Sequence, residues 1–80
     1  MKPHVIVYSR PGCHLCDDAK SVIEQVKQEI DLTLEEVNIE HDLHLLQRYR
    51  FDIPIITING VEAFRHRVEP STLRETLLRL

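Results

Sequence analysis

Apolar and polar residues follow two different periods along this chain, one typical of strands and one typical of helices. Residues 4–8 read HVIVY and are almost all apolar or β-branched, which predicts a strand buried on both faces of a sheet. Asp17 and Asp18 lie where the first turn of a helix is expected, and carboxylates stabilise that end of a helix. The apolar residues behind this helix prediction recur at every third or fourth position between polar residues, and they are Ala19, Val22, Ile23, Val26 and Ile30.

The middle of the chain predicts a second strand and a shorter helix. Residues 32–39 favour a strand, but the alternation of apolar and polar positions slips at Glu35 and Glu36. Such a slip predicts either a bulge or a change of the buried face. Residues 41–49 favour a short helix, because three leucines and a tyrosine recur there at helical spacing.

A β-hairpin is predicted in the second half of the chain. Residues 53–58 are rich in isoleucine and favour a third strand, and residues 61–64 favour a fourth. Between them, Asn59-Gly60 is the dipeptide most typical of a two-residue hairpin turn. The third and fourth strands should therefore pair in the antiparallel direction.

A last helix is predicted to open within residues 69–72. Pro70 lies near its first position, where proline is favoured because its missing N–H would be unpaired in any case. Thr72 and Glu75 have the spacing of a capping box, in which the two side chains pair with backbone N–H groups. The apolar face of this helix is expected to carry Leu73, Leu77 and Leu80.

The elements follow the order βαβαββα and predict an α/β fold. A helix that links two consecutive strands usually leaves them parallel, whereas the hairpin adds an antiparallel pair. The expected architecture is therefore a four-stranded mixed sheet flanked by three helices. With 80 residues in the sequence, residues 1–80 are expected to form a single domain.

Composition narrows the classes of partner. Hydrophobic residues make up 42% and charged residues 29% of the chain, which is typical of a globular protein, and the formal net charge is −3. A chain without a broad basic field is not expected to bind nucleic acid, and without a long apolar segment it is not expected to bind or cross a membrane. We expect a monomer in the cytoplasm, where structural disulfides are rare.

Cys13 and Cys16 are the two cysteines of the chain, and their spacing suggests redox chemistry. At the start of a helix, two cysteines three positions apart lie on one face, close enough to form and break a disulfide. Unpaired N–H groups of the first turn favour a thiolate on Cys13, and His14 would add positive charge when protonated. The Asp17 carboxylate should raise the pKa of the nearer thiol, that of Cys16. This polarity predicts Cys13 as the attacking thiol and Cys16 as the resolving one.

Other uses of the cysteine pair stay open at the level of the residues. A structural disulfide is disfavoured by the expected compartment. A structural zinc site would need His41 and His44 as further ligands, and 24 residues separate Cys16 from His41, more than the usual about 12–15. The pair could also hold a cluster shared between subunits, or belong to a binding module whose cysteines do not turn over.

Three segments resemble the glutaredoxin branch of the thioredoxin superfamily, and the likeness spans essentially the whole chain. VYSRPGCHLC is similar to the strand and loop of the family's active site, DIPIITING to the segment that holds a cis-proline before a hairpin, and HRVEPSTLRETL to a small group of glutaredoxin-like proteins. The resemblance implies that Cys13 is the nucleophile and Cys16 the resolving thiol. It also implies that Pro54 has a cis peptide bond facing the disulfide, and that the backbone of Ile53 pairs with a substrate strand.

The resemblance also suggests how substrate and reductant would bind. Arg10 matches a basic residue that holds a glutathione carboxylate. His14 and Leu15 replace the family's Pro-Tyr between the cysteines, and residues 66–70, with Glu69 as their acidic member, replace a Gly-Gly stretch that cradles glutathione. The implied partners are protein disulfides and a reductase. No tightly bound cofactor or metal is expected, and electrons would come from glutathione or from a donor of the thioredoxin-reductase type.

Overall fold

The computed structural model of this chain describes residues 2–80 and confirms the predicted order of elements. A short 3-10 helix, η1, lies between the second strand and the second α-helix. The elements are β1 His4–Ser9, α1 His14–Lys27, β2 Thr33–Asn38, η1 Ile39–His41, α2 Leu43–Tyr49, β3 Ile55–Ile58, β4 Val61–Arg65 and α3 Pro70–Leu78.

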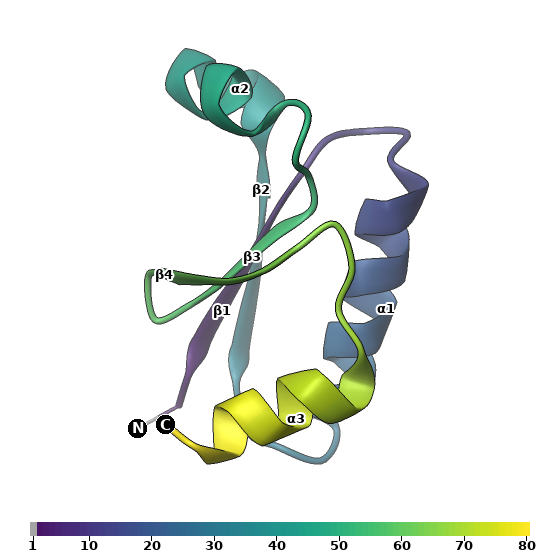
Figure 1. The fold of residues 1–80 in the computed structure, drawn as a ribbon, viewed down its shortest axis with the longest axis vertical. Coiled ribbons are helices and arrows are strands. Elements are labelled where there is room, and N and C mark those ends of the chain that lie inside the picture. Colours follow the sequence, from purple (N-terminus) through teal and green to yellow (C-terminus); the bar gives the residue numbers. More distant parts are fainter. Residues whose placement is uncertain (1) are drawn as a thin grey trace.

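The strands form one mixed sheet with the order β2-β1-β3-β4. Strand β1 is parallel to β2 and antiparallel to β3, and β3 is antiparallel to β4. Figure 1 shows α1 and α3 on one side of the sheet and α2 on the other. The four-stranded mixed sheet flanked by three helices is therefore confirmed.

Strand β1 is buried unequally on its two faces, which corrects the prediction of complete burial. Val5, Val7 and Ser9 are buried on the face that packs against α1 and α3, whereas Ile6 and Tyr8 on the other face are half-buried. The difference arises because α2 is short, so that it packs over only part of its face of the sheet (Figure 1).

In strand β2, the slip in the apolar–polar alternation at Glu35 and Glu36 reflects a change of the buried face. Its register with β1 runs regularly from His4↔Thr33 to Ser9↔Asn38, so the alternative of a bulge is wrong. Leu34 packs against the cluster under α1 and α3, whereas Ile39, just after the strand, is buried in the cluster under α2. The bulge in this sheet lies instead between β3 and β4, opposite Ile56 and Thr57.

The helix predicted over residues 41–49 and the strand predicted over residues 53–58 both begin later than expected. The Asp42 side chain accepts hydrogen bonds from the amides of His44 and Leu45 at 2.9 and 3.3 Å, so α2 begins at Leu43. Strand β3 begins at Ile55, because the preceding proline has no N–H to donate to a strand ladder. The Asn59-Gly60 turn is confirmed, with φ of 52° and 86°.

Helix α3 begins at Pro70, so Thr72 is not at the N-cap position that the predicted capping box requires. Glu69 is the N-cap residue and makes no side-chain capping bond, while Thr72 lies inside the first turn. The predicted capping box is therefore wrong, and the Thr72 carbonyl instead accepts a hydrogen bond from the Thr76 hydroxyl at 2.8 Å. Leu73 and Leu77 are buried as predicted, but Leu80 lies beyond the helix and is 66% exposed.

The larger part of the hydrophobic core lies between the sheet and the pair α1 and α3. Its buried members are Val5, Val7, Ala19, Ile23, Val26, Leu32, Ile56, Ile58, Val68, Leu73 and Leu77. A second, smaller cluster of Ile39, Tyr49 and Ile55 packs under α2. The core therefore holds α1 rigidly against β1, and α1 begins at the cysteines.

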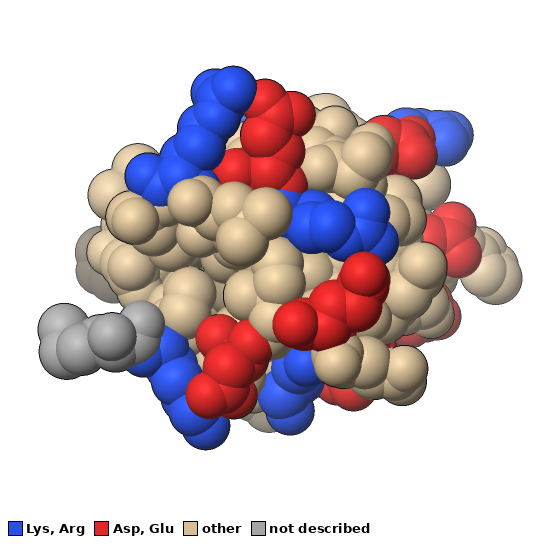
Figure 2. Space-filling model, turned by 90° about the horizontal axis from the view of Figure 1, so that it is seen from below, with Lys and Arg blue, Asp and Glu red and all other residues tan. Residues whose placement is uncertain are grey.

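Charged residues of both signs are mixed on the surface. On the face shown in Figure 2, Lys and Arg side chains lie next to Asp and Glu side chains, and neither sign forms a continuous patch. None of the helices within residues 2–80 has both the length and the apolar sequence needed to cross a bilayer.

Candidate active site

One end of the sheet gathers the segments that the sequence singles out. Strand β1 ends beside the end of β2, in the pair Ser9↔Asn38, and beside the beginning of β3, in the pair Tyr8↔Ile55. The end of β4 lies next to the same point, because Ile55 pairs with Arg65. The loop that leads to the cysteines, the Ile53-Pro54 segment and the β4–α3 loop therefore leave the sheet at one end (Figure 1).

The two cysteines form a disulfide at the start of α1, with their Cα atoms 5.2 Å apart. Cys13 is the N-cap residue, and its Sγ atom accepts a hydrogen bond from the Cys16 N–H at 3.1 Å. Cys16 is 1% exposed, whereas Cys13 is half-buried. Cys13 therefore offers some surface to a reagent in solvent, whereas Cys16 offers almost none.

Gly12 allows the chain to turn from β1 into this helix. Its φ is 80°, a value that residues with a Cβ atom rarely adopt. A Cβ atom added there would meet nothing within 4 Å, so glycine is needed for backbone conformation and not for space. The turn brings Cys13 to the N-terminus of α1, where unpaired backbone N–H groups favour negative charge on sulfur.

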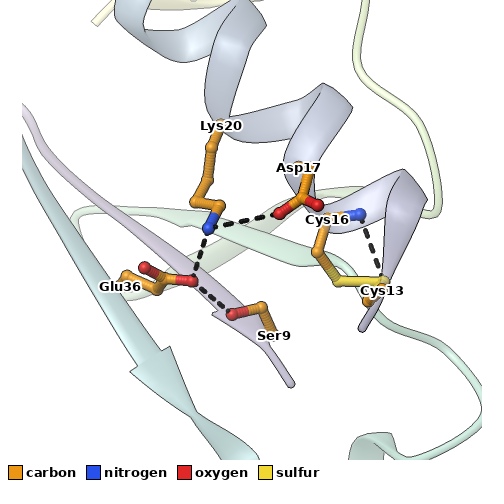
Figure 3. A network of polar contacts seen from close by, with 6 residues as sticks. All are labelled: Ser9, Cys13, Cys16, Asp17, Lys20 and Glu36. Carbon is orange, nitrogen blue, oxygen red and sulfur yellow. Dashed lines mark hydrogen bonds and ion pairs between the residues drawn. A yellow bond between two sulfur atoms is a disulfide. The ribbon is translucent and has the colours of Figure 1, made fainter. Parts of the chain in front are cut away.

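A network of charged groups lies beside the disulfide (Figure 3). The Lys20 ammonium lies 2.8 Å from the Glu36 carboxylate and 3.5 Å from that of Asp17, and the buried Ser9 hydroxyl donates to Glu36 at 2.9 Å. Hydrogen bonds from Lys20 and Ser9 lower the pKa of Glu36, and the hydrogen bond to Glu36 raises the pKa of Lys20. Lys20 therefore partly compensates the charge of Asp17, the carboxylate that was expected to raise the pKa of Cys16.

The expected cis peptide bond is confirmed between Ile53 and Pro54. Pro54 is buried, and its carbonyl accepts a hydrogen bond from the His66 N–H at 2.8 Å. Within residues 2–80, the backbone N–H and C=O of Ile53 have no hydrogen-bond partner. The chain therefore holds Pro54 in place, and the neighbouring Ile53 has backbone groups that are available for hydrogen bonds.

A hollow of about 190 Å³ lies between the start of α1 and the β4–α3 loop. It brings Leu15 together with His66, Arg67 and Glu69, although Leu15 lies about 50 positions before them in the sequence. His66 has a φ of 69°, a left-handed conformation uncommon for a residue with a side chain. The side chains of residues 66 and 67 thus border this hollow at the place where the resemblance implies a Gly-Gly stretch.

Arg10 lies away from that hollow and is paired with a carboxylate. Its guanidinium donates to Glu40 at 3.0 Å, and it lines a second hollow of about 350 Å³ beside the network of Lys20 and Glu36. His14, the first residue of α1, is exposed. The predicted substrate residues therefore divide between two sides of the cysteine loop.

Sequence reasoning missed Ser9, Lys20 and Glu36. One signal was present, because Lys20 follows Asp17 by three positions and Cys16 by four, which places these side chains on neighbouring turns of one helix. The pairing of Lys20 with Glu36 depends on how β2 is placed beside β1, and a local pattern does not contain that information.

His41 and His44, the further ligands that a zinc site would need, belong to η1 and α2 respectively. In the part of the chain from Lys2 to Leu80, no three side chains of His, Cys, Asp or Glu are grouped as metal ligands would be.

The sequence is similar to a known family and to a protein of that kind. A family model described as glutaredoxin-like domain (DUF836) matches residues 4–78. The chain is 32% identical over 81 residues to the glutaredoxin-like protein YDR286C homolog of Dictyostelium discoideum, covering 90% of this chain and 75% of that protein.

Solved structures share the fold. A protein from X. campestris has a TM-score of 0.81 and 24% identity, with 95% of this chain and 97% of that chain covered. The oxidized mitochondrial thioredoxin 3 of Saccharomyces cerevisiae has a TM-score of 0.71 and 13% identity, with 99% and 79% covered. These TM-scores show a thioredoxin-like fold, and at such low identities they show the fold alone.

Proposed function

The chain belongs to the glutaredoxin-like domain family, and from this membership and the geometry of its cysteines we propose that it is a dithiol–disulfide oxidoreductase. Its substrates are protein disulfides or mixed disulfides. The reaction transfers two electrons from the thiols of Cys13 and Cys16 to the substrate disulfide, and the two cysteines close into the disulfide described above.

The proposed reaction has two displacement steps. The Cys13 thiolate attacks one substrate sulfur, forms a mixed disulfide and expels the other substrate sulfur, which takes up a proton. The Cys16 thiol then loses its proton to solvent, and its sulfur attacks the Cys13 sulfur. The Cys13–Cys16 bond forms, the mixed disulfide breaks, and the second substrate thiol leaves with a proton.

The unequal exposure of the two cysteines is the observation that carries the proposal. Cys13 is half-buried at a helix N-terminus, and its sulfur accepts the Cys16 N–H at 3.1 Å, whereas Cys16 is buried. An attacking thiol needs access and stabilised negative charge, and a resolving thiol needs only to reach its neighbour. The unpaired backbone of Ile53 is suited to hold an extended substrate segment across this sulfur.

Single cysteine variants test the proposal. Cys16→Ser should accumulate a stable mixed disulfide with a disulfide-bonded peptide, because the resolving thiol is absent, and mass spectrometry should locate it at Cys13. Cys13→Ser is the matched control and should form no adduct, since its remaining thiol is buried. Equal trapping by both variants, or an inert Cys13 in the reduced wild type, would contradict the proposal.

An external thiol must regenerate the reduced form. We propose glutathione or a dithiol donor of the thioredoxin-reductase type, acting in the cytoplasm, where thiols are kept reduced. Recycling assays with glutathione and its reductase, and separately with thioredoxin reductase, distinguish the two donors. Arg10 bears on the outcome, because a glutathione carboxylate would have to displace Glu40 from its guanidinium.

A further inference from the structure

The side chain of Cys16 lies between α1 and β1, close to the polar side chain of Ser9 at the end of β1 (Figure 3). On α1, Cys16 continues the buried row formed by Ala19 and Ile23. On β1, Ser9 continues the buried row of Val5 and Val7, which faces the same core. Since β1 ends just before the cysteine loop, Ser9 is the buried polar residue of the strand on the side of the disulfide (Figure 3).

Two charged residues, Lys20 and Glu36, connect Ser9 with the surface. The Ser9 hydroxyl and the Lys20 ammonium both donate to the same oxygen of Glu36, at 2.9 and 2.8 Å. Lys20 lies four residues after Cys16, one helical turn along α1. The charged and titratable residues that line the adjoining hollow, from every element around it, are Arg10, Asp17, Lys20, Glu36 and His41.

Such charges act differently on the two redox states. The oxidised pair is neutral, whereas the reduced pair carries negative charge whenever a thiol ionises. A nearby negative charge therefore destabilises the reduced form, and a nearby positive charge stabilises it. Lys20 and Glu36 carry opposite charges, so their effects on the reduced pair oppose each other.

We propose that Lys20 and Glu36 are positioning residues that set the redox equilibrium of the Cys13–Cys16 pair, with Ser9 fixing the Glu36 carboxylate. The inference rests on the proposed function, to which it adds a determinant of electron flow. Loss of the Lys20 charge leaves Asp17 and Glu36 uncompensated and favours the disulfide. Loss of the Glu36 charge leaves Lys20 less compensated and favours the dithiol.

Equilibration with mixtures of reduced and oxidised dithiothreitol tests this directly. The two thiols of dithiothreitol supply two electrons and two protons and close into its cyclic disulfide, and alkylation with mass spectrometry gives the reduced fraction of the protein. Lys20→Met should shift the equilibrium constant toward the disulfide and Glu36→Gln toward the dithiol. Each shift should be about three- to tenfold, equivalent to about 14 to 30 mV.

A second ion pair in the chain supplies a matched control. Arg74 and Glu29 lie 2.8 Å apart with side chains 34% and 50% exposed, close to the values of 2.8 Å, 32% and 48% for Lys20 and Glu36. Glu29 lies just beyond the far end of α1, about 20 Å along the helix from Cys16. Arg74→Met and Glu29→Gln should leave the equilibrium constant within about twofold of wild type.

The outcomes separate the inference from the proposed function. Shifts of opposite sign at Lys20 and Glu36, reduced at high salt, support the inference, whereas shifts of the same sign or below twofold overturn it. If one variant does not fold, Asp17→Asn replaces it and should shift the equilibrium toward the dithiol. A protein that equilibrates normally with dithiothreitol but never forms a mixed disulfide with a substrate would contradict the proposed function alone.

Discussion

The sheet face under α1 and α3 and the sheet end beside the cysteines are built from different groups. The face under the helices is lined by aliphatic side chains such as Ile23, Val26 and Leu73, all with no exposed surface. The end beside the cysteines contains a buried hydroxyl, ion pairs that are partly exposed, and His66 in a left-handed conformation. The first region supplies stability through burial, whereas the partly exposed charges of the second contribute little to stability and are the groups that we propose act on the cysteines.

This difference predicts that stability and redox behaviour are separable. A change in the apolar face should alter the free energy of unfolding and leave the redox equilibrium of the cysteines intact. Removing a charge at the sheet end should shift the redox equilibrium, as expected above for Lys20 and Glu36, and should change the free energy of unfolding by less than about 1 kcal/mol. Three further predictions probe the comparison.

Ile23→Ala should have the largest effect on stability. Its side chain is completely buried in the cluster under α1 and α3, so truncation leaves a cavity and should lower the free energy of unfolding by about 2–5 kcal/mol. Chemical denaturation of the oxidised protein measures the loss. Leu80→Ala, at an exposed position, is the control and should change stability by less than about 0.5 kcal/mol. A large shift in the dithiothreitol equilibrium of folded Ile23→Ala would show that the two regions are not separable.

Substitutions of His66 should change stability through the backbone conformation at this position and not through loss of the imidazole. Its φ of 69° favours glycine over any residue with a Cβ atom. His66→Gly should therefore be about 1 kcal/mol more stable than His66→Ala, because both lack the imidazole and this conformation is strained only for alanine, which has a Cβ atom. Thermal unfolding of the two variants makes the comparison. Equal stabilities would mean that this position stores no backbone strain.

The smallest expected effect is the contribution of Glu36 to the pH dependence of the free energy of unfolding. Its pKa is lowered by Lys20 and Ser9 from an ordinary value of 4.5, so the unfolded chain binds the proton more readily. The stabilisation is complete above pH 4.5 and is lost as pH falls through the folded pKa. Because the carboxylate is about half exposed, the amount should be below about 1 kcal/mol. Unfolding curves of wild type and Glu36→Gln should differ less at pH 3 than at pH 7, and an unchanged difference would contradict this.

Several features follow from short stretches of sequence. Asn59-Gly60 encodes its turn because the conformation belongs to the dipeptide itself. The start of α1 at His14, with Cys13 as its N-cap, follows from the glycine before it and the apolar spacing after it. The predicted capping box failed at Thr72, although its spacing was correct. Pro70 is the first residue of the helix, which places the threonine inside the first turn and not at the cap.

The order of residues alone determined the sequence of strands and helices, the hairpin, and the position of both sulfurs in one helical turn. Those properties depend on neighbours within a few positions. The tertiary structure decided what surrounds the sulfurs, because Ser9 and Glu36 lie 27 residues apart and Lys20 and Glu36 lie 16 apart. They meet only because β2 pairs with β1 in one particular register while α1 packs across both, and that arrangement is selected by the burial of the whole core and not by any local pattern.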